Sequence, residues 1–171
     1  MLALHDSPGH LARRLHQIST SIFADRMARL GEDITPVQYA CLVALVDYPG
    51  LDQASLSGLV AHDRVTIGGA VDRLVAKGFV QRKISRRDRR ARVLTLSPGG
   101  RALLDRIEPG VRVMQAELLD GLTDKERATF LRLLHKAVAA GNTRSRAPLH
   151  LPEIPADPAS DAPSGAADGD G

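Results

Sequence analysis

The stretch that decides the fold reads Asp63-Arg-Val-Thr-Ile-Gly-Gly-Ala-Val-Asp-Arg-Leu-Val-Ala-Lys-Gly-Phe-Val80. Its apolar residues recur at steps of three and four, which is the period of one buried helix face. Asp63 suits the N-cap because its carboxylate can accept hydrogen bonds from free backbone amides, and Gly78 suits the left-handed position after the last turn. The stretch therefore predicts a helix over 63–77.

A second short helix precedes this one, and a hairpin follows it. Asp52 is a plausible N-cap, and a tight connection joins the short helix to the longer one, so residues 52–77 form a helix-turn-helix candidate. Two short β-prone runs at 79–84 and 92–96 then predict an antiparallel hairpin. A hairpin directly after a helix-turn-helix is a wing, and we place it at 79–96.

Longer helices flank this predicted lobe on both sides. Apolar residues at helical spacing place them over 11–30, 36–46, 98–119 and 124–140. Pro109-Gly110 is expected to kink or interrupt the third of these helices. Their apolar surface exceeds what one core of this size needs, so a partner subunit is expected to cover part of it. The predicted fold class is mainly α with a small β-hairpin wing: a winged helix-turn-helix lobe plus a helical dimerisation region.

The wing carries the strongest charge signal. Seven of the eleven residues at 82–92 are basic, and Asp88 is the single acid among them. Such a cluster repels itself unless an anion is near, and duplex DNA supplies one negative charge per about 1.7 Å of axis. A charge run alone is more often a solvated loop, but its place after a helix-turn-helix favours DNA contact. The predicted DNA-binding residues are Arg64, Val65, Thr66, Gly68, Gly69, Arg73, Arg86, Arg87, Arg89, Arg90 and Arg92.

Two features of the predicted reading helix need a physical reason. Gly68 and Gly69 lie in its middle, where each costs about 1 kcal/mol relative to alanine. Either DNA or a neighbouring helix approaches closely there, and the sequence favours neither. Asp72 is repelled by phosphate, so we expect it to orient Arg73 or an arginine of the wing. Asp88 is expected likewise to hold a wing arginine.

The chain of 171 residues has a formal net charge of +3, which averages two unlike segments. Residues 147–171 hold five acidic and no basic residues, whereas residues 1–146 hold 23 basic against 15 acidic ones. We therefore divide the chain into a domain at 8–141, with dimerisation helices at both ends, and an acidic Pro/Ala/Gly-rich tail at 142–171. The tail's composition is typical of disorder. We expect an inert solubilising extension; alternatively, the tail competes with DNA for the wing.

Together these motifs resemble the MarR family of winged-helix transcriptional regulators. The matching residues are 63–80, Asp-Arg-Arg at 88–90 and Leu-Thr-Leu-Ser-Pro-Gly-Gly at 94–100, and the resemblance covers about residues 8–140. It implies a homodimer that binds a pseudo-palindromic operator in double-stranded DNA. It also implies release from the operator by a small ligand.

Within the family, Thr35-Pro-Val-Gln-Tyr39 and Asp52-Gln53 resemble the branch that controls aromatic-acid catabolism. This resemblance implies an aromatic carboxylate effector, such as a phenolic acid or a hydroxylated nicotinate, bound between the dimer helices and the DNA-binding lobe. A carboxylate needs a cation or several hydrogen-bond donors. The predicted ligand-binding residues are His10, Arg13, Arg14, His16 and Tyr39.

Other functions receive less support. A redox-responsive regulator would use Cys41, which lies among apolar residues and fits a buried thiol better. A metal-responsive regulator would use the histidines, which lack metal-ligand spacing. A winged-helix module that binds an acidic protein is a further alternative. No catalytic or cofactor motif is present, so neither enzymatic activity nor a cofactor is expected. Without an apolar run of about 18 residues or a secretory start, we expect a cytoplasmic protein with no membrane partner.

Overall fold

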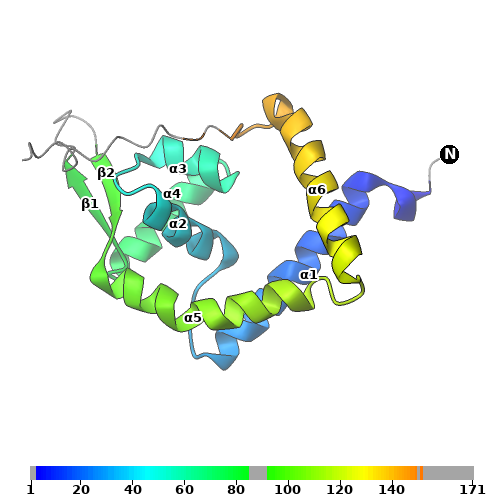
Figure 1. Cartoon of the computed structure of the whole chain (residues 1–171). Coiled ribbons are helices and arrows are strands. Elements are labelled where there is room, and N and C mark those ends of the chain that lie inside the picture. Colours follow the sequence, from blue (N-terminus) through cyan, green and yellow to red (C-terminus); the bar gives the residue numbers. More distant parts are fainter. Residues whose placement is uncertain (1–2, 85–91, 150, 152–171) are drawn as a thin grey trace, which may run out of the picture.

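The computed structural model describes residues 3–84, 92–149 and 151. The lobe, shown on the left of Figure 1, consists of α2 (Pro36–Asp47), α3 (Gln53–Val60), α4 (Arg64–Ala76), β1 (Val80–Ile84) and β2 (Arg92–Leu96). The frame around it consists of α1 (Pro8–Arg29), α5 (Pro98–Glu117) and α6 (Asp124–Gly141). Short 3-10 turns η1 (Leu4–Asp6) and η2 (Asn142–Arg144) precede α1 and follow α6. The predicted fold class, mainly helical with one hairpin, is confirmed.

The helices of the lobe begin at the residues whose side chains can cap them. Asp52 Oδ1 accepts hydrogen bonds from two amides in the first turn of α3 at 2.8 and 2.9 Å. Asp63 Oδ1 does the same for α4 at 3.0 and 2.9 Å. These bonds satisfy amides that have no partner within the helix. The connection between α3 and α4 is tight because Ala61 adopts a left-handed conformation with φ 55°, which the sequence did not signal.

One apolar core joins the lobe to the frame. The lobe contributes side chains that are at most 1% exposed: Cys41, Leu42, Leu45, Leu56, Ile67, Val71 and Leu74. The frame adds Phe23 and Met27 from α1 and Leu103 and Ile107 from α5 to the same cluster. A fully buried side chain of this size contributes about 1.5–3 kcal/mol, so this shared core fixes the lobe against α1 and α5.

The hairpin is held against the lobe by backbone contacts. β1 and β2 pair antiparallel, with Val80 opposite Leu96. Leu94 donates its N–H to the carbonyl of Leu51 at 2.7 Å, which ties β2 to the connection between α2 and α3. At the start of α5, a Cβ on Gly100 would collide with the carbonyl oxygen of Phe79. Only glycine therefore allows α5 to begin so close to the hairpin.

Of the kink or interruption expected at Pro109-Gly110, the interruption is wrong, because α5 continues through Pro109 to Glu117. A proline removes one helical hydrogen bond, but Ile107 and Val111 on either side are buried at 0% and 4% exposure. Tertiary packing therefore stabilises the helix across the missing bond. The neighbouring Gly110 lets α1 approach, because a Cβ there would lie 3.2 Å from Leu30 Cδ1.

The ends of the frame are less buried than its centre. α1 begins at Pro8, three residues before the predicted start, and the chain turns after it at Gly31 with φ 69°. α6 has no buried residue, and its leucines stay largely exposed in the single chain. Within the residues that the structure describes, no helix is both long and apolar enough to cross a membrane.

Candidate nucleic-acid interface and ligand cavity

The first turn of α4 presents a small, exposed surface. Arg64, Val65 and Thr66 are all exposed, and Val65 retains 86% of its accessible surface. The Thr66 hydroxyl donates to Asp63 Oδ2 at 2.7 Å. Hydrogen bonds from the backbone N–H and the hydroxyl of Thr66 hold the pKa of Asp63 below its usual range. The cap is therefore ionised at neutral pH, and it fixes the geometry of the exposed turn.

The two glycines of α4 have different surroundings. A Cβ on Gly68 would lie 3.1 Å from Nε2 of Gln53, so α3 makes the close approach at this position. A Cβ on Gly69 would meet no protein atom within 4 Å. The neighbouring helix therefore accounts for Gly68, whereas Gly69 leaves open space on the outer face of α4.

An ion pair joins α4 to the wing. Arg82 Nη2 of β1 donates to Asp72 Oδ1 at 2.5 Å. This confirms the expectation that Asp72 holds an arginine of the wing. Arg73, the next residue on α4, is exposed. The pair fixes β1 relative to the helix and leaves Arg73 facing solvent.

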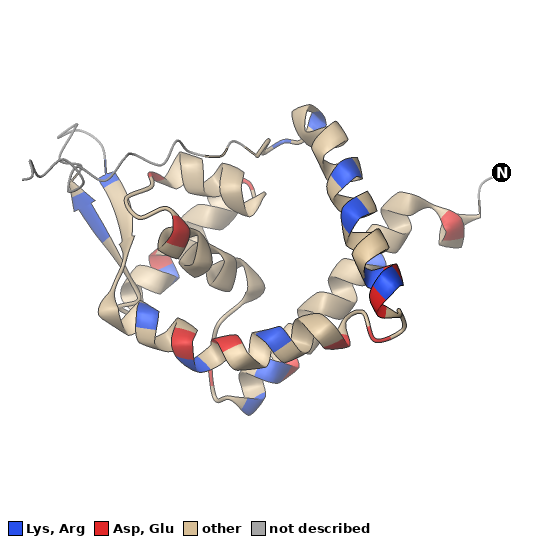
Figure 2. Ribbon diagram, in the orientation of Figure 1, with Lys and Arg blue, Asp and Glu red and all other residues tan. Residues whose placement is uncertain are grey.

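Basic residues continue along the hairpin, and Figure 2 shows them as blue bands on β1 and at the start of β2. Lys83 and Arg92 are exposed, and Arg92 pairs with Ile84 in the strand register. The loop between the strands falls outside the described residues. It contains four predicted DNA contacts, Arg86, Arg87, Arg89 and Arg90, as well as Asp88 and its expected pairing.

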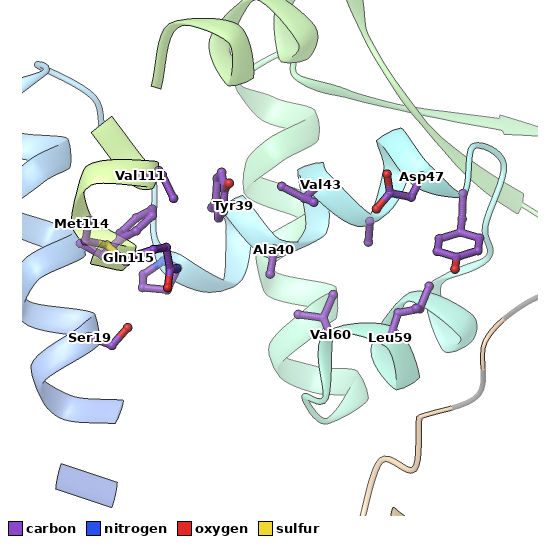
Figure 3. A pocket seen from close by; sticks show the side chains of 14 residues that line it. Ser19, Tyr39, Ala40, Val43, Asp47, Leu59, Val60, Val111, Met114 and Gln115 are labelled. Carbon is purple, nitrogen blue, oxygen red and sulfur yellow. The ribbon is translucent and has the colours of Figure 1, made fainter. Parts of the chain in front are cut away.

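A cavity of about 450 Å³ lies where the frame meets the lobe. Its walls come from α1, α2, α3 and α5 and from the residues next to α2: Ser19, Phe23, Pro36, Tyr39, Ala40, Val43, Ala44, Asp47, Tyr48, Leu59, Val60, Val111, Met114 and Gln115. Figure 3 shows Ser19 and Gln115 toward one end and Asp47 toward the other, with apolar side chains between them. This arrangement suits a flat apolar molecule that has polar groups at both ends.

Tyr39 is the polar group near the middle of this cavity. Burial raises its pKa, the charge of Glu108 raises it further, and the charge of Arg112 acts in the opposite direction. The phenol therefore stays protonated and can donate a hydrogen bond. Arg112 is held by Glu108 at 2.6 Å, so a cation lies close enough to influence the cavity although it does not line it.

The structure brings one of the five predicted ligand-binding residues, Tyr39, to the cavity wall. His16 lines a second, apolar groove of about 710 Å³ between α1 and α6. At 3.6 residues per turn, His10, Arg13 and Arg14 point roughly 120° or more away from Ser19, which faces the cavity. Arg13 and Arg14 are exposed, whereas His10 is half-buried with its Nε2 shielded from solvent, and none of the three lines the cavity.

Most of the polar wall was not predicted from the sequence. Tyr39, Val43 and Asp47 follow one another at steps of four on α2, and all three line the cavity. This stripe lies beside the one that fills the core, so a second apolar face on α2 was the available signal. Ser19 and Gln115 carry no such signal, because only the packing of α1 and α5 brings them together.

Cys41 does not have the environment of a redox sensor. Its side chain is fully buried, and burial raises its pKa to about 12. The reactive thiolate is therefore essentially absent at neutral pH. In the part of the chain that the structure describes, no group of three or more His, Cys, Asp or Glu side chains could hold a metal ion.

Comparison with known proteins identifies the architecture. The MarR family model matches residues 34–91. The HTH-type transcriptional repressor NicR of Pseudomonas putida is 35% identical over 130 residues, which cover 76% of this chain and 81% of NicR. This chain belongs to the MarR family. The wing and the helix-turn-helix described above are therefore those of a MarR-family winged-helix transcriptional regulator.

Two solved structures of similar fold are those of regulators with a small-molecule ligand. BpsR of Bordetella bronchiseptica, whose DNA binding is regulated by 6-hydroxynicotinic acid, is 28% identical with a TM-score of 0.74; the match covers 80% of this chain and 96% of BpsR. PcaV of Streptomyces coelicolor, solved in complex with its natural ligand, is 32% identical with a TM-score of 0.72, over 82% of this chain and 98% of PcaV.

Proposed function

We propose that this MarR-family protein is a homodimeric repressor, not an enzyme, which a small aromatic carboxylate releases from a pseudo-palindromic operator in double-stranded DNA. The position of the cavity carries the proposal. It lies between α1 and α5 of the frame and α2 and α3 of the lobe, so a ligand there contacts both parts at once. A ligand that favours one arrangement of these parts shifts the protein toward that arrangement.

In the proposed complex, α4 enters the major groove and the wing contacts the flanking backbone. Arg64, Val65, Thr66 and Arg73 face solvent on α4, and Gly69 leaves room for DNA beside them. Gly68 contributes by letting α4 lie close to α3. The wing contributes Arg92 and, as a proposal from sequence alone, Arg86, Arg87, Arg89 and Arg90.

The frame supplies the dimer in this proposal. α6 exposes Leu131, Leu133, Leu134 and Val138, and the apolar groove between α1 and α6 adds to this surface. A second copy that covers both would set the distance between the two α4 helices. Half-sites lie one helical turn apart, about 34 Å, so a small ligand-induced change in this distance weakens operator binding.

The proposed ligand is an aromatic carboxylate whose carboxylate lies away from Asp47, the one charged side chain among the residues that line the cavity. The side chains around Tyr39 are mostly apolar and suit an aromatic ring, and Tyr39 offers a donor that stays protonated. From the same chain, Arg112 is the cation that we propose to attract the carboxylate, because its charge already acts on Tyr39. His10, Arg13, Arg14 and His16 stay candidates for the same role in a dimer, where the outer side of α1 meets other surfaces.

The test combines DNA binding with ligand addition. Fluorescence anisotropy should show binding to the duplex upstream of its own or a neighbouring gene, with log K falling steeply as log salt rises. Adding 6-hydroxynicotinic acid should release the duplex and raise the melting temperature, whereas its uncharged amide should do neither. A salt slope near zero would instead support a protein-interaction module. Replacing Arg89 and Arg90 by alanine should flatten the slope, by about 0.9 for each phosphate that the wing no longer neutralises.

A further inference from the structure

The segment after α6 follows a defined path in the structure. Nδ2 of Asn142 donates to the carbonyl of Leu149 at 3.0 Å, and the N–H of Leu149 donates back to Oδ1 of Asn142 at 2.7 Å. Inside this loop, Ser145 Oγ accepts from the N–H of Ala147 at 3.2 Å. One side-chain amide thus closes a short loop at both of its hydrogen-bonding groups. We call this pair of bonds the Asn142 clasp.

The closed loop lies on the first helix of the helix-turn-helix. A Cβ on Gly58 of α3 would lie 3.2 Å from the carbonyl oxygen of Pro148, which is closer than most real contacts of this kind. Glycine in the middle of a helix is unfavourable, and here it allows the loop to approach the helix backbone. Figure 1 shows the segment after α6 (orange) leading from α6 toward α3. The clasp and Gly58 therefore place the start of the tail beside the DNA-binding part of the lobe.

The remaining chain has the opposite charge to that surface. Residues 152–171 contain five acidic residues and no lysine or arginine. We define the basic surface as the exposed cations of α4 and the hairpin: Arg64, Arg73, Lys83 and Arg92. Asp63 caps α4 and Asp72 binds Arg82, so neither forms an ion pair with these four cations. The charges of Arg64 and Arg73 also act on Asp52 and Asp33, respectively, and these carboxylates balance part of the positive charge.

The tail is long enough to extend from its attachment beside α3 to the neighbouring helix α4. A flexible chain of 20 residues has a root-mean-square length of about 25 Å, and α3 and α4 are joined by one tight turn. Attachment at this point gives the acidic residues an effective concentration of about a millimolar at the basic surface. Even a weak charge attraction then keeps the tail there for part of the time at low salt.

We propose that the acidic segment 152–171 docks on the basic surface of its own chain and competes there with DNA. The proposal rests on the proposed DNA-binding function. Duplex must displace the tail, so the protein binds all sequences more weakly than its basic surface alone would. Such a competitor lowers non-specific binding, which depends on charge, more than operator binding, which also uses contacts to the bases.

The decisive comparison keeps the full chain length and removes only the tail's charge. The variant carries Glu153→Gln with Asp157, Asp161, Asp168 and Asp170 each changed to Asn. For a random-sequence duplex in 50 mM salt, we expect binding about three to ten times tighter than wild type, with a steeper salt slope. At 300 mM salt the difference should vanish, since screening weakens the tail's attraction. Equal affinities at both salt concentrations would overturn the proposal.

A second measurement separates docking from simple repulsion between the tail and DNA. Without DNA, neutralising the tail should shift the NMR amide signals of Arg64, Thr66 and Lys83. Tighter DNA binding without such shifts would also overturn docking. If neither protein binds any duplex while the shifts occur, the proposed DNA-binding function fails and docking stands.

The clasp is tested by Asn142→Ala in the full chain. We expect Asn142→Ala to raise the affinity for random duplex by part of the amount that neutralising the tail does. Adding Asn142→Ala to the neutral-tail variant should raise the affinity no further. Thermal unfolding should be nearly unchanged, because both hydrogen bonds of the clasp are exposed to solvent. An Asn142→Ala protein that binds random duplex as wild type does would overturn the role of the clasp.

Discussion

The lobe and the frame differ in how far they bury their apolar side chains. The lobe buries most of its large apolar side chains, apart from Val65 and Ile84, and it begins α3 and α4 with carboxylate caps. In the frame, α6 buries nothing and exposes Leu131, Leu133, Leu134 and Val138 by 46, 50, 41 and 62%. The lobe thus covers most of its apolar surface within its own chain, whereas α6 leaves an apolar surface that we propose a second copy covers. In the proposed dimer, the lobe therefore contacts DNA, whereas the frame sets the distance between the two α4 helices.

The largest expected effect comes from breaking the dimer through the frame. Leu134→Asp places a charge on the apolar surface of α6, which disfavours association because the charge would be buried. The lobe should stay folded, but operator affinity should fall about 100-fold or more, since the second half-site no longer adds to binding. Analytical ultracentrifugation and anisotropy with operator duplex measure both effects.

The matched control is Arg132→Asp, because Arg132 is exposed and lies about 100° or more around the helix from Leu131, Leu133, Leu134 and Val138. It should leave the dimer intact. If Leu134→Asp remained a dimer with full operator affinity, α6 would not be the contact surface and the contrast between lobe and frame would disappear.

A tenfold effect is expected within the lobe from its two adjacent glycines. Gly69→Ala should stabilise the free protein by about 0.5–1 kcal/mol, because its Cβ meets no protein atom and alanine favours the helix. Operator affinity should nevertheless fall about tenfold, ~1.4 kcal/mol, because the methyl group occupies space that we assign to DNA. Chemical denaturation measures the expected rise in stability, and fluorescence anisotropy measures the expected fall in operator affinity.

Gly68→Ala is the natural comparison for that variant. Its Cβ would lie 3.1 Å from Gln53 Nε2, so Gln53 must move, and the stability gain of Gly69→Ala should shrink or disappear. Were Gly69→Ala to bind operator as tightly as wild type, DNA would not approach α4 at that position.

Features that depend on neighbouring residues could be predicted from the sequence. The caps at Asp52 and Asp63 are local, so residue type and spacing predict them. Charge complementarity predicted an arginine partner for Asp72 but did not distinguish Arg73 from an arginine of the wing. The continuity of α5 through Pro109 could not be predicted, because it depends on how Ile107 and Val111 pack against other elements.

The ligand cavity shows the same limit. Tyr39 was predicted, but Asp47 was missed although it lies on the same stripe of α2. Which side of α1 faces α2 is a tertiary property, so the sequence could not reveal that Arg14 points away from the cavity while Ser19 lines it. Chemistry suggested a cation, and only the arrangement in space distinguishes the candidates.

A smaller effect, about three- to tenfold, is expected where frame and lobe meet. Arg112→Gln should weaken release by 6-hydroxynicotinic acid because it removes a cation whose charge acts on Tyr39 and which we propose to attract the carboxylate. Operator affinity without ligand should not change. Arg14→Ala is the comparison: if it abolishes release and Arg112→Gln does not, the cation comes from the outer side of α1 in the dimer.

The smallest expected effect is a difference in acid sensitivity between the caps of the lobe and the frame. The backbone amide of Ser55 contributes most to lowering the pKa of Asp52, and that of Thr66 does so for Asp63. In α6, hydrogen bonds from the hydroxyl and the N–H of Thr123 lower the pKa of Glu126. A carboxyl with a lowered folded pKa stabilises the fold at pH values above its unfolded pKa, and the stabilisation is lost as pH falls through the folded value.

Asp63→Asn keeps a capping side chain but cannot titrate, so its melting temperature should fall less than that of wild type between pH 7 and pH 3. Glu126→Gln should also reduce the fall in melting temperature between pH 7 and pH 3, but by less than Asp63→Asn does, because α6 buries no residue in its own chain. Melting curves at pH 7, 5, 4 and 3 measure this difference. If Glu126→Gln protected the whole chain from acid as much as Asp63→Asn does, α6 would be as tightly coupled to the core as α4, and the independence of the lobe would have to be abandoned.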